Sequence, residues 1–180
     1  MDIQTTPIEG LLILNPRIFK DERGYFFESY NKLEFERLGL NFNFVQDNQS
    51  FSIKHVLRGL HYQNPPFEQG KLVSVASGAA LDVAVDIRKD SKTFGHHFSV
   101  ILSEENNKIF WIPAGFAHGF ITLEDNTRFV YKCTNNYNKA AEGGIIWNDP
   151  DLNIDWGIDK PLISEKDQIL PRLKEIKSSF

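Results

Sequence analysis

Short runs of alternating apolar residues, separated by turn sequences, set the strongest limit on how this chain can fold. In the clearest run, Leu81, Val83, Val85 and Ile87 alternate with Ala80, Asp82, Ala84 and Asp86. This period of two predicts a β-strand with one apolar face and one mixed face. Similar runs cover residues 98–102, 109–112, 119–123 and 128–133, and turn sequences lie at 77–78, 92–95, 105–107 and 124–126. Many short strands at this spacing predict an all-β sandwich or barrel, and a jelly roll in particular.

Helical patterns are confined to two short stretches. Asn31 followed by Glu34 resembles a capping box and Gly39 supplies a stop, so a helix is expected over residues 31–38. The second stretch begins at Ser164, near the C-terminus, and is punctuated by Pro171. Because the chain has 180 residues and shows no repeat or linker, we expect a single domain over residues 1–180.

Charge and composition narrow the class of protein. The net charge of -4 provides no basic field for a nucleic-acid partner. With 41% hydrophobic residues the chain is globular, yet no apolar run approaches the roughly 18 residues of a membrane span. The only cysteine, Cys133, cannot form an internal disulfide, and Met1 begins no signal peptide. We therefore expect a cytoplasmic protein with no membrane partner.

The segment from Arg58 to Lys71 holds the densest group of candidate functional residues. Its Pro-Pro and Gln-Gly turn signals predict two strands that meet across it, with His61 on one and Lys71 at the start of the next. A base beside a cation suits a reaction in which a proton leaves and an oxygen gains negative charge. The alternative is an inert structural histidine among solvated charges.

Gly59 is expected to mark a β-bulge in this segment. Arg58 and His61 have opposite parity on a strand, so their side chains should point to opposite faces. An extra residue in the ladder would bring both onto the face of a ligand.

The motif Pro113-Ala114-Gly115-Phe116-Ala117-His118 resembles the second half of the cupin pattern, which brings one histidine into a barrel. Metal-binding cupins carry His-x-His in the first half, whereas this chain has His61-Tyr62-Gln63. Even with Glu68, two histidines and one carboxylate make a thin ligand set. We therefore expect a site without metal or other cofactor.

Several polar residues on the expected strands have two interpretations each. Tyr131 is either a core aromatic residue or an acid facing His61 from the other side. Asp82 and Asp86 are either solvated carboxylates or groups that orient a histidine. Asp167 has capping-box spacing from Ser164, but it is also a candidate for orienting His61.

A series of motifs resembles the dTDP-4-dehydrorhamnose 3,5-epimerase family, which are metal-free cupins of nucleotide-sugar biosynthesis. Each motif alone is weak, but together and in this order they are specific, and they cover nearly the whole chain. The motifs are Asp21 to Glu28, Gln46-Asp47-Asn48, Arg58-Gly59-Leu60-His61, Gly70-Lys71-Leu72-Val73, Leu81 to Asp86, Ile112 to Phe120, Tyr131-Lys132-Cys133-Thr134 and Trp147-Asn148-Asp149-Pro150. The resemblance implies a cupin-type jelly roll with short helices near residues 31–38 and at the C-terminus.

The resemblance also implies residue roles. His61 is the general base, paired with Asp167; Lys71 stabilises an enolate oxygen, and Tyr131 is the acid on the other face. Substrate binding falls to Arg23, Phe26, Glu28, Gln46, Asn48, Arg58, His118, Tyr137, Glu142 and Lys166. The resemblance further implies that the partner is a dTDP-sugar and that the protein forms a homodimer. In that dimer Arg23, Phe26 and Glu28 would serve the other subunit's site, and Tyr137 would lie against the nucleotide base.

The chemistry implied by the resemblance is inversion of C3 and C5 of dTDP-4-dehydro-6-deoxy-D-glucose, as in dTDP-rhamnose biosynthesis. A ketone at C4 acidifies the neighbouring C–H bonds, and the enolate that forms needs a cation near O4. Three alternatives stay open from the sequence: a 3- or 5-epimerase of a related dTDP-keto sugar, a metal-dependent cupin enzyme, and a non-catalytic sugar-binding jelly roll.

Overall fold

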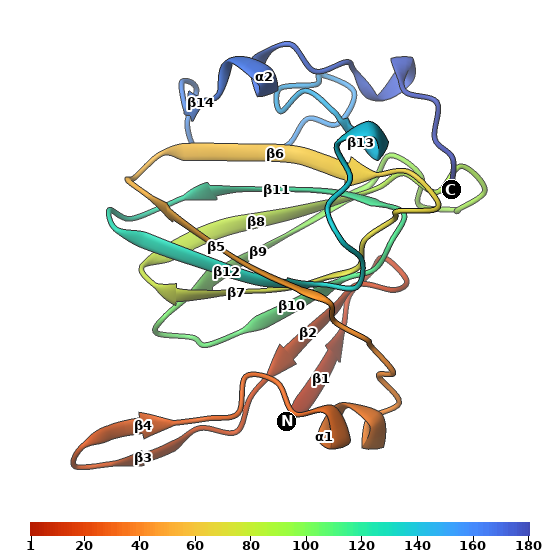
Figure 1. The fold of residues 1–180 in the computed structure, drawn as a ribbon. Helices are drawn as coiled ribbons and strands as arrows, with labels where there is room; N and C mark the ends of the chain where they lie inside the picture. The colour runs from red at the N-terminus through yellow and green to blue at the C-terminus, as the bar shows by residue number, and fades with distance from the viewer.

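The computed structural model describes residues 1–180 and consists mainly of short antiparallel strands (Figure 1). The strands are β1 (Asp2–Thr5), β2 (Leu12–Asn15), β3 (Phe19–Asp21), β4 (Gly24–Phe26), β5 (Gln46–Ser52), β6 (Val56–Gln63), β7 (Lys71–Ser77), β8 (Ala79–Asp86), β9 (His97–Ser103), β10 (Ile109–Ile112), β11 (Phe116–Thr122), β12 (Thr127–Cys133), β13 (Glu142–Gly144) and β14 (Leu162–Ile163). The α-helices are α1 (Lys32–Arg37) and α2 (Glu165–Gln168), and single 3-10 turns cover Lys139–Ala141 and Leu173–Glu175. None of the helices has the length and apolar character needed to cross a membrane.

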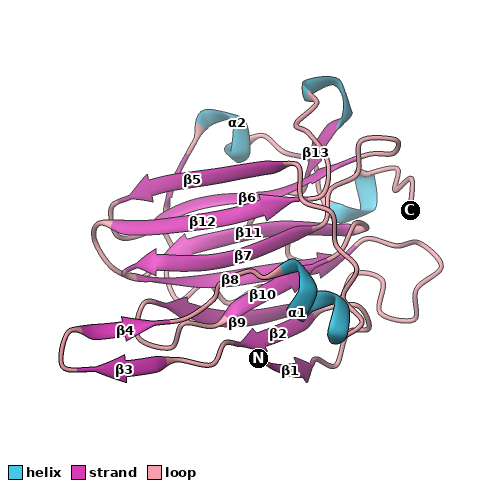
Figure 2. Ribbon diagram, turned by 60° about the horizontal axis from the view of Figure 1, so that its bottom comes forward, coloured by secondary structure: helices cyan, strands magenta, loops and turns pink.

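Two sheets form the body of the fold. The first has the strand order β1-β2-β10-β7-β12-β5, and the second has the order β13-β6-β11-β8-β9, with β14 alongside β6. The sheets face each other as two layers, and β3 and β4 pair only with each other in a separate hairpin (Figures 1 and 2). The prediction of an all-β jelly roll with short helices at residues 31–38 and near the C-terminus is confirmed.

Apolar side chains fill the interior between these sheets and cover the outer face of the second sheet. The interior between the sheets is filled by residues such as Val73, Phe110 and Phe129, all fully buried. The outer face of the second sheet is covered by the C-terminal segment, through Leu152 and Trp156 among others. Strand β8 is therefore buried on both faces, and the interpretation of Asp82 and Asp86 as solvated carboxylates is wrong, because both are 0% exposed.

The expected pairing of two strands across residues 58–71 is also wrong. Strand β6 lies in the second sheet, between β11 and β13, whereas β7 lies in the first sheet, between β10 and β12. The connection after Gln63 thus crosses from one layer to the other. Turn residues indicate where a chain reverses, but they do not decide which sheet the next strand joins. As a result His61 and Lys71 stand on facing sheets.

The predicted bulge at Gly59 is confirmed. His118 of β11 is opposite His61, but Phe120 is opposite Arg58, so two steps on β11 match three on β6. Gly59 has φ +125°, and a Cβ added there would lie 2.5 Å from the Cα of Gly119. Only glycine fits this close approach. The extra residue brings Arg58 and His61 to the same pocket.

Asp86 ends β8 in a dense hydrogen-bonded network that lends itself to a stability test. Its carboxylate accepts hydrogen bonds from Arg88 Nη2, Ser91 Oγ and Thr93 Oγ1, each at 2.7 Å. Burial alone would raise the pKa of Asp86, but these hydrogen bonds outweigh it and lower the pKa from 3.8 to about 2. Because the pKa of Asp86 is lower in the folded state than in the unfolded state, its ionised carboxylate stabilises the fold at pH values above the unfolded pKa. This stabilisation is lost as the pH falls toward 2.

We expect Asp86→Asn to lower the free energy of unfolding at pH 7 by about 2 kcal/mol, which is the worth of a pKa shift of this size. The difference in the free energy of unfolding between the variant and the unsubstituted protein should shrink as the pH falls from 5 toward 3. Urea denaturation at several pH values measures this. A difference in the free energy of unfolding that stays constant over that pH range would contradict the claim that the ionised Asp86 carboxylate stabilises the fold.

Candidate active site

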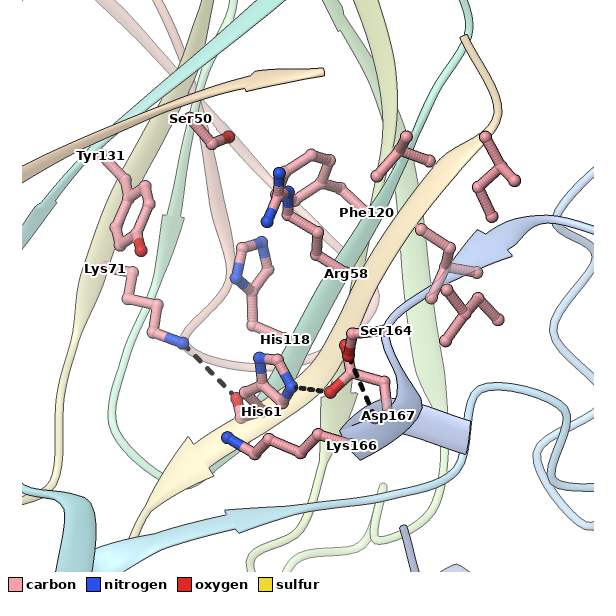
Figure 3. A pocket seen from close by; sticks show the side chains of 14 residues that line it. Ser50, Arg58, His61, Lys71, His118, Phe120, Tyr131, Ser164, Lys166 and Asp167 are labelled. Atoms are coloured by element: carbon pink, nitrogen blue, oxygen red, sulfur yellow. Dashed lines mark hydrogen bonds and ion pairs between the residues drawn. The ribbon is translucent and has the colours of Figure 1, made fainter. Parts of the chain in front are cut away.

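A pocket of about 560 Å³ opens between the two sheets. Its walls combine polar groups with apolar side chains from Val56, Leu57, Phe120, Leu162 and Ile163. Figure 3 shows the polar groups: Ser50, Arg58, His61, Lys71, His118, Tyr131, Ser164, Lys166 and Asp167. The four residues expected to be catalytic, His61, Lys71, Tyr131 and Asp167, therefore line one pocket although they come from four different elements.

His61 and Asp167 form a tight pair. His61 Nε2 lies 2.7 Å from Asp167 Oδ1, and the amide of Gly59 donates a hydrogen bond to Oδ2 at 3.2 Å. Burial alone would raise the pKa of Asp167, but hydrogen bonds from His61, Gly59 and Ser164 lower it below the ordinary value. The carboxylate is therefore ionised at neutral pH and accepts a hydrogen from Nε2. That leaves Nδ1 of His61 as the nitrogen free to take a proton.

Asp167 fulfils both roles that the sequence left open. Its backbone amide donates a hydrogen bond to Ser164 Oγ at 3.1 Å, as a capped first turn of α2 requires. Its side chain at the same time holds His61. The cap fixes the backbone that aims the carboxylate, so the two roles support each other.

Lys71 is a buried cation at the floor of this site. Only 9% of the residue is exposed, and its Nζ donates a hydrogen bond to the carbonyl oxygen of His61 at 3.4 Å. Burial lowers the pKa of Lys71, while the negative charge available at Cys133, Asp82 and Glu142 partly opposes this. A poorly hydrated ammonium is well suited to stabilise negative charge that develops on a nearby oxygen.

His118 is held by a second carboxylate. Its Nε2 lies 2.8 Å from Asp82 Oδ2, and both residues are buried. Burial lowers the pKa of His118 and raises the pKa of Asp82, so both groups are pushed toward their neutral forms. Of the two interpretations of Asp82, orientation of a histidine is confirmed, although that histidine is His118 and not His61. The carboxylate of Asp86 orients no histidine and instead accepts hydrogen bonds from Arg88, Ser91 and Thr93.

Tyr131 faces His61 from the other side of the pocket. It lies on β12 of the first sheet, whereas His61 lies on β6 of the second sheet (Figure 3). Burial raises the pKa of Tyr131, and the nearby guanidinium of Arg58 opposes this rise. A base on one wall and a phenol on the facing wall can remove a proton from one face of a carbon and return one to the other.

A second hollow of about 290 Å³ adjoins the first and shares His61, Lys71 and Tyr131 with it. Four of the expected substrate-binding residues line it: Gln46, Asn48, Tyr137 and Glu142. Glu142 connects two of its neighbours, because it accepts a hydrogen bond from the Tyr137 hydroxyl at 3.0 Å and one from Lys166 Nζ at 2.5 Å. The two hollows together give room for a ligand that extends beyond the catalytic groups.

Arg23, Phe26 and Glu28 line neither hollow. Arg23 and Phe26 belong to the β3–β4 hairpin, which extends away from the sheets (Figure 1), and Glu28 follows it. Phe26 is 66% exposed, and Arg23 pairs only with Asp21 in its own hairpin. Within one chain, therefore, the structure does not bring these three residues to the site.

Sequence reasoning missed several residues of the pocket wall. Ser50 and Phe120 line it, as do Leu162 and Ile163 of β14. For Ser50 a signal was available, because Gln46, Asn48, Ser50 and Ser52 alternate on one strand and so share a face. Nothing in the sequence indicates that β14 lies beside β6. No group of three or more His, Cys, Asp or Glu side chains stands close enough to hold a metal ion.

The fold and the pocket define the chain as a cupin-type jelly roll with acid–base groups between its sheets. Residues 5–175 match the family model described as dTDP-4-dehydrorhamnose 3,5-epimerase. The curated dTDP-4-dehydrorhamnose 3,5-epimerase of Shigella flexneri is 53% identical over 93% of each chain. The crystal structure of the enzyme from Elizabethkingia anophelis has a TM-score of 0.92 at 50% identity, covering 97% of each chain. That of the Legionella pneumophila epimerase in complex with dTDP-4-keto-L-rhamnose has a TM-score of 0.93 at 49% identity, covering 98% of this chain and 94% of that one.

The chain belongs to the dTDP-4-dehydrorhamnose 3,5-epimerase family and is an enzyme.

Proposed function

We propose that this enzyme inverts C3 and C5 of dTDP-4-dehydro-6-deoxy-D-glucose and so forms dTDP-4-dehydro-L-rhamnose. The observation that carries the proposal is the placement of His61 and Tyr131 on facing sheets of one pocket. Inversion of a carbon next to a ketone needs a base on one face and an acid on the other. The ligand named for the Legionella pneumophila structure, dTDP-4-keto-L-rhamnose, is the product of this reaction.

In the mechanism that we propose, His61 takes the proton from C3 or C5 through Nδ1. Asp167 keeps the imidazole in the required tautomer and stabilises the imidazolium. Lys71 stabilises the negative charge that moves onto O4 in the enolate. Tyr131 then protonates the carbon from the opposite face. The reaction balances without any redox partner, because one proton leaves the carbon and one returns.

We further propose that the remaining expected residues bind the dTDP moiety and the sugar. Arg58 and Lys166 supply positive charge for the diphosphate, and both line the main pocket. Gln46, Asn48, Tyr137 and Glu142 surround the adjoining hollow, where the Tyr137 ring suits contact with a nucleotide base. His118, neutral and held by Asp82, provides a hydrogen-bonding group beside the sugar.

Incubation with dTDP-4-dehydro-6-deoxy-D-glucose in D₂O, followed by NMR, tests the reaction. The expected result is deuterium at both C3 and C5 together with the L-rhamno configuration. Deuterium and inversion at one carbon only would instead identify a single-carbon epimerase. No exchange in the native enzyme, with activity gained on addition of iron or zinc, would favour a metal-dependent cupin enzyme.

We propose a homodimer in which the β3–β4 hairpin of each subunit completes the site of the other. Two features support it. Arg23, Phe26 and Glu28 lie outside the site of their own chain, and Tyr25 and Phe26 expose 53% and 66% of their surface. In addition, edge strand β5 and the residues that flank it expose three large apolar side chains. These are Val45, Phe51 and Ile53, each about half exposed. An apolar surface of this kind is typical of a contact with another chain.

Light scattering is expected to give the mass of a dimer. A mixing experiment tests the shared site: Arg23→Ala and Tyr131→Phe subunits, each impaired alone, should regain activity when they exchange subunits, since one of the two mixed sites is then intact. A fully active monomer, or mixtures that never regain activity, would contradict the proposal.

We place the enzyme in the cytoplasm as one domain over residues 1–180. Cys133 is buried and free, which suits a reducing compartment. The apolar clusters support the single domain, because they join residues from Ile8 to Leu173 across the same pair of sheets.

A further inference from the structure

Strand β5 carries a row of polar side chains on the face that turns toward the space between the sheets. Gln46, Asn48, Ser50 and Ser52 alternate with the exposed residues Asp47, Gln49 and Phe51. Buried polar groups usually have hydrogen-bond partners, and three of these four residues do; the exception is the hydroxyl of Ser50. The amide oxygen of Gln46 accepts a hydrogen bond from the amide of Tyr137 at 2.9 Å, and Asn48 Nδ2 donates one to Cys133 Sγ at 3.6 Å.

Ser52 has a partner from the opposite layer. Its hydroxyl oxygen accepts hydrogen bonds from Nε and Nη2 of Arg58, at 3.3 Å and 3.2 Å. Ser52 is only 4% exposed, whereas Arg58 is exposed and lines the pocket. The strands involved, β5 and β6, belong to different sheets and share no ladder. The Arg58 side chain thus spans the gap between the layers, and Ser52 is the only group that accepts hydrogen bonds from its guanidinium.

The position of this guanidinium affects both Tyr131 and any anionic ligand in the pocket. It lies near Tyr131, where its charge opposes the rise in the pKa of the phenol that burial causes. Its remaining N–H groups stay free for a ligand, because Ser52 occupies only one edge of the planar fork. An arginine held by one edge offers the other to an anionic oxygen at a fixed angle, with less conformational entropy to lose on binding.

We propose that Ser52 is a positioning residue of the epimerase: it fixes the guanidinium of Arg58 so that the free edge meets the diphosphate of the substrate. The inference rests on the proposed function, since it takes the dTDP-sugar as the ligand. Ser52 itself touches no reacting atom and acts only through Arg58.

A double-mutant cycle tests this coupling. Ser52→Ala should raise KM for the dTDP-sugar, and the Kd for dTDP in calorimetry, by about tenfold, the lower end for a hydrogen bond to a charged group. We expect kcat to stay within about threefold, because substrate binding is affected more than proton transfer. In an Arg58→Ala background the same substitution should change neither constant further. Ser52→Thr, which keeps the hydroxyl, should restore most of the affinity.

Ser99 on β9 is exposed and provides a matched control. Ser99→Ala should have the same KM for the dTDP-sugar and the same Kd for dTDP as the unsubstituted enzyme. Unchanged dTDP affinity in Ser52→Ala, or equal losses with and without Arg58, would overturn the inference while leaving the epimerase function intact. If Ser52→Ala fails to fold, Ser52→Cys, with a much weaker acceptor, serves in the cycle. Failure of the unsubstituted enzyme to epimerise the sugar would overturn the proposed function instead, and dTDP calorimetry would still report on the coupling.

Discussion

Replacing His61 with Asn is expected to lower the rate of solvent exchange at both C3 and C5 by about 10²–10⁴-fold or more, the usual contribution of a general base. The reason is local. Asp167 holds Nε2, so Nδ1 is the nitrogen that can take the proton, and Asn offers no comparable base. An amide at this position can still contact Asp167, so the fold and dTDP binding should persist.

The measurement is deuterium incorporation by NMR, with calorimetry of dTDP as the check on binding. Exposed His96 provides the control, because His96→Asn alters a histidine that lines neither hollow and should leave exchange unchanged. Asp167→Asn should impair exchange less than His61→Asn, since it removes the orienting group and not the base. Near-normal exchange at either carbon in His61→Asn would show that His61 is not the base for that carbon.

Much of this site could be predicted from the sequence because strand periodicity is local information. The alternation of Leu81, Val83 and Val85 reflects a property of consecutive residues and was sufficient to identify β8. The bulge at Gly59 followed from the same rule, since Arg58 and His61 could share a face only if the ladder gained a residue.

The remaining features depend on which segments meet in space, and periodicity carries no such information. Asp167 and His61 are 106 positions apart, and their contact depends on how the C-terminal segment covers the second sheet. This segment covers the apolar face of β8, which includes Val83 and Val85, so the mixed face turns toward the first sheet. That is why solvated carboxylates were a reasonable but wrong interpretation of Asp82 and Asp86. The crossing between β6 and β7 was missed for a similar reason, because its prolines are equally compatible with a hairpin.

Replacing Tyr131 with Phe is expected to separate exchange from inversion. The substitution removes one hydroxyl from the first sheet and leaves His61 and Lys71 in place. Deprotonation and stabilisation of the enolate should therefore continue, and the proton should return from the face of His61. What fails is protonation from the other face, so inversion should fall by about 10²–10⁴-fold, the contribution of a positioned acid, while exchange falls much less.

The ring of Tyr131 packs against Phe129, with centroids 6.2 Å apart. Because Phe preserves this contact, we expect the variant to keep its fold. The measurement compares deuterium at C3 and C5 with the configuration of the product, in the same sample and over the same time. Tyr137→Phe is the matched control, because it removes a phenol from the adjoining hollow, where its partner is Glu142. It should weaken dTDP binding and leave the ratio of exchange to inversion unchanged. If Tyr131→Phe lost exchange and inversion equally, the division of the two proton transfers between the facing sheets would be wrong.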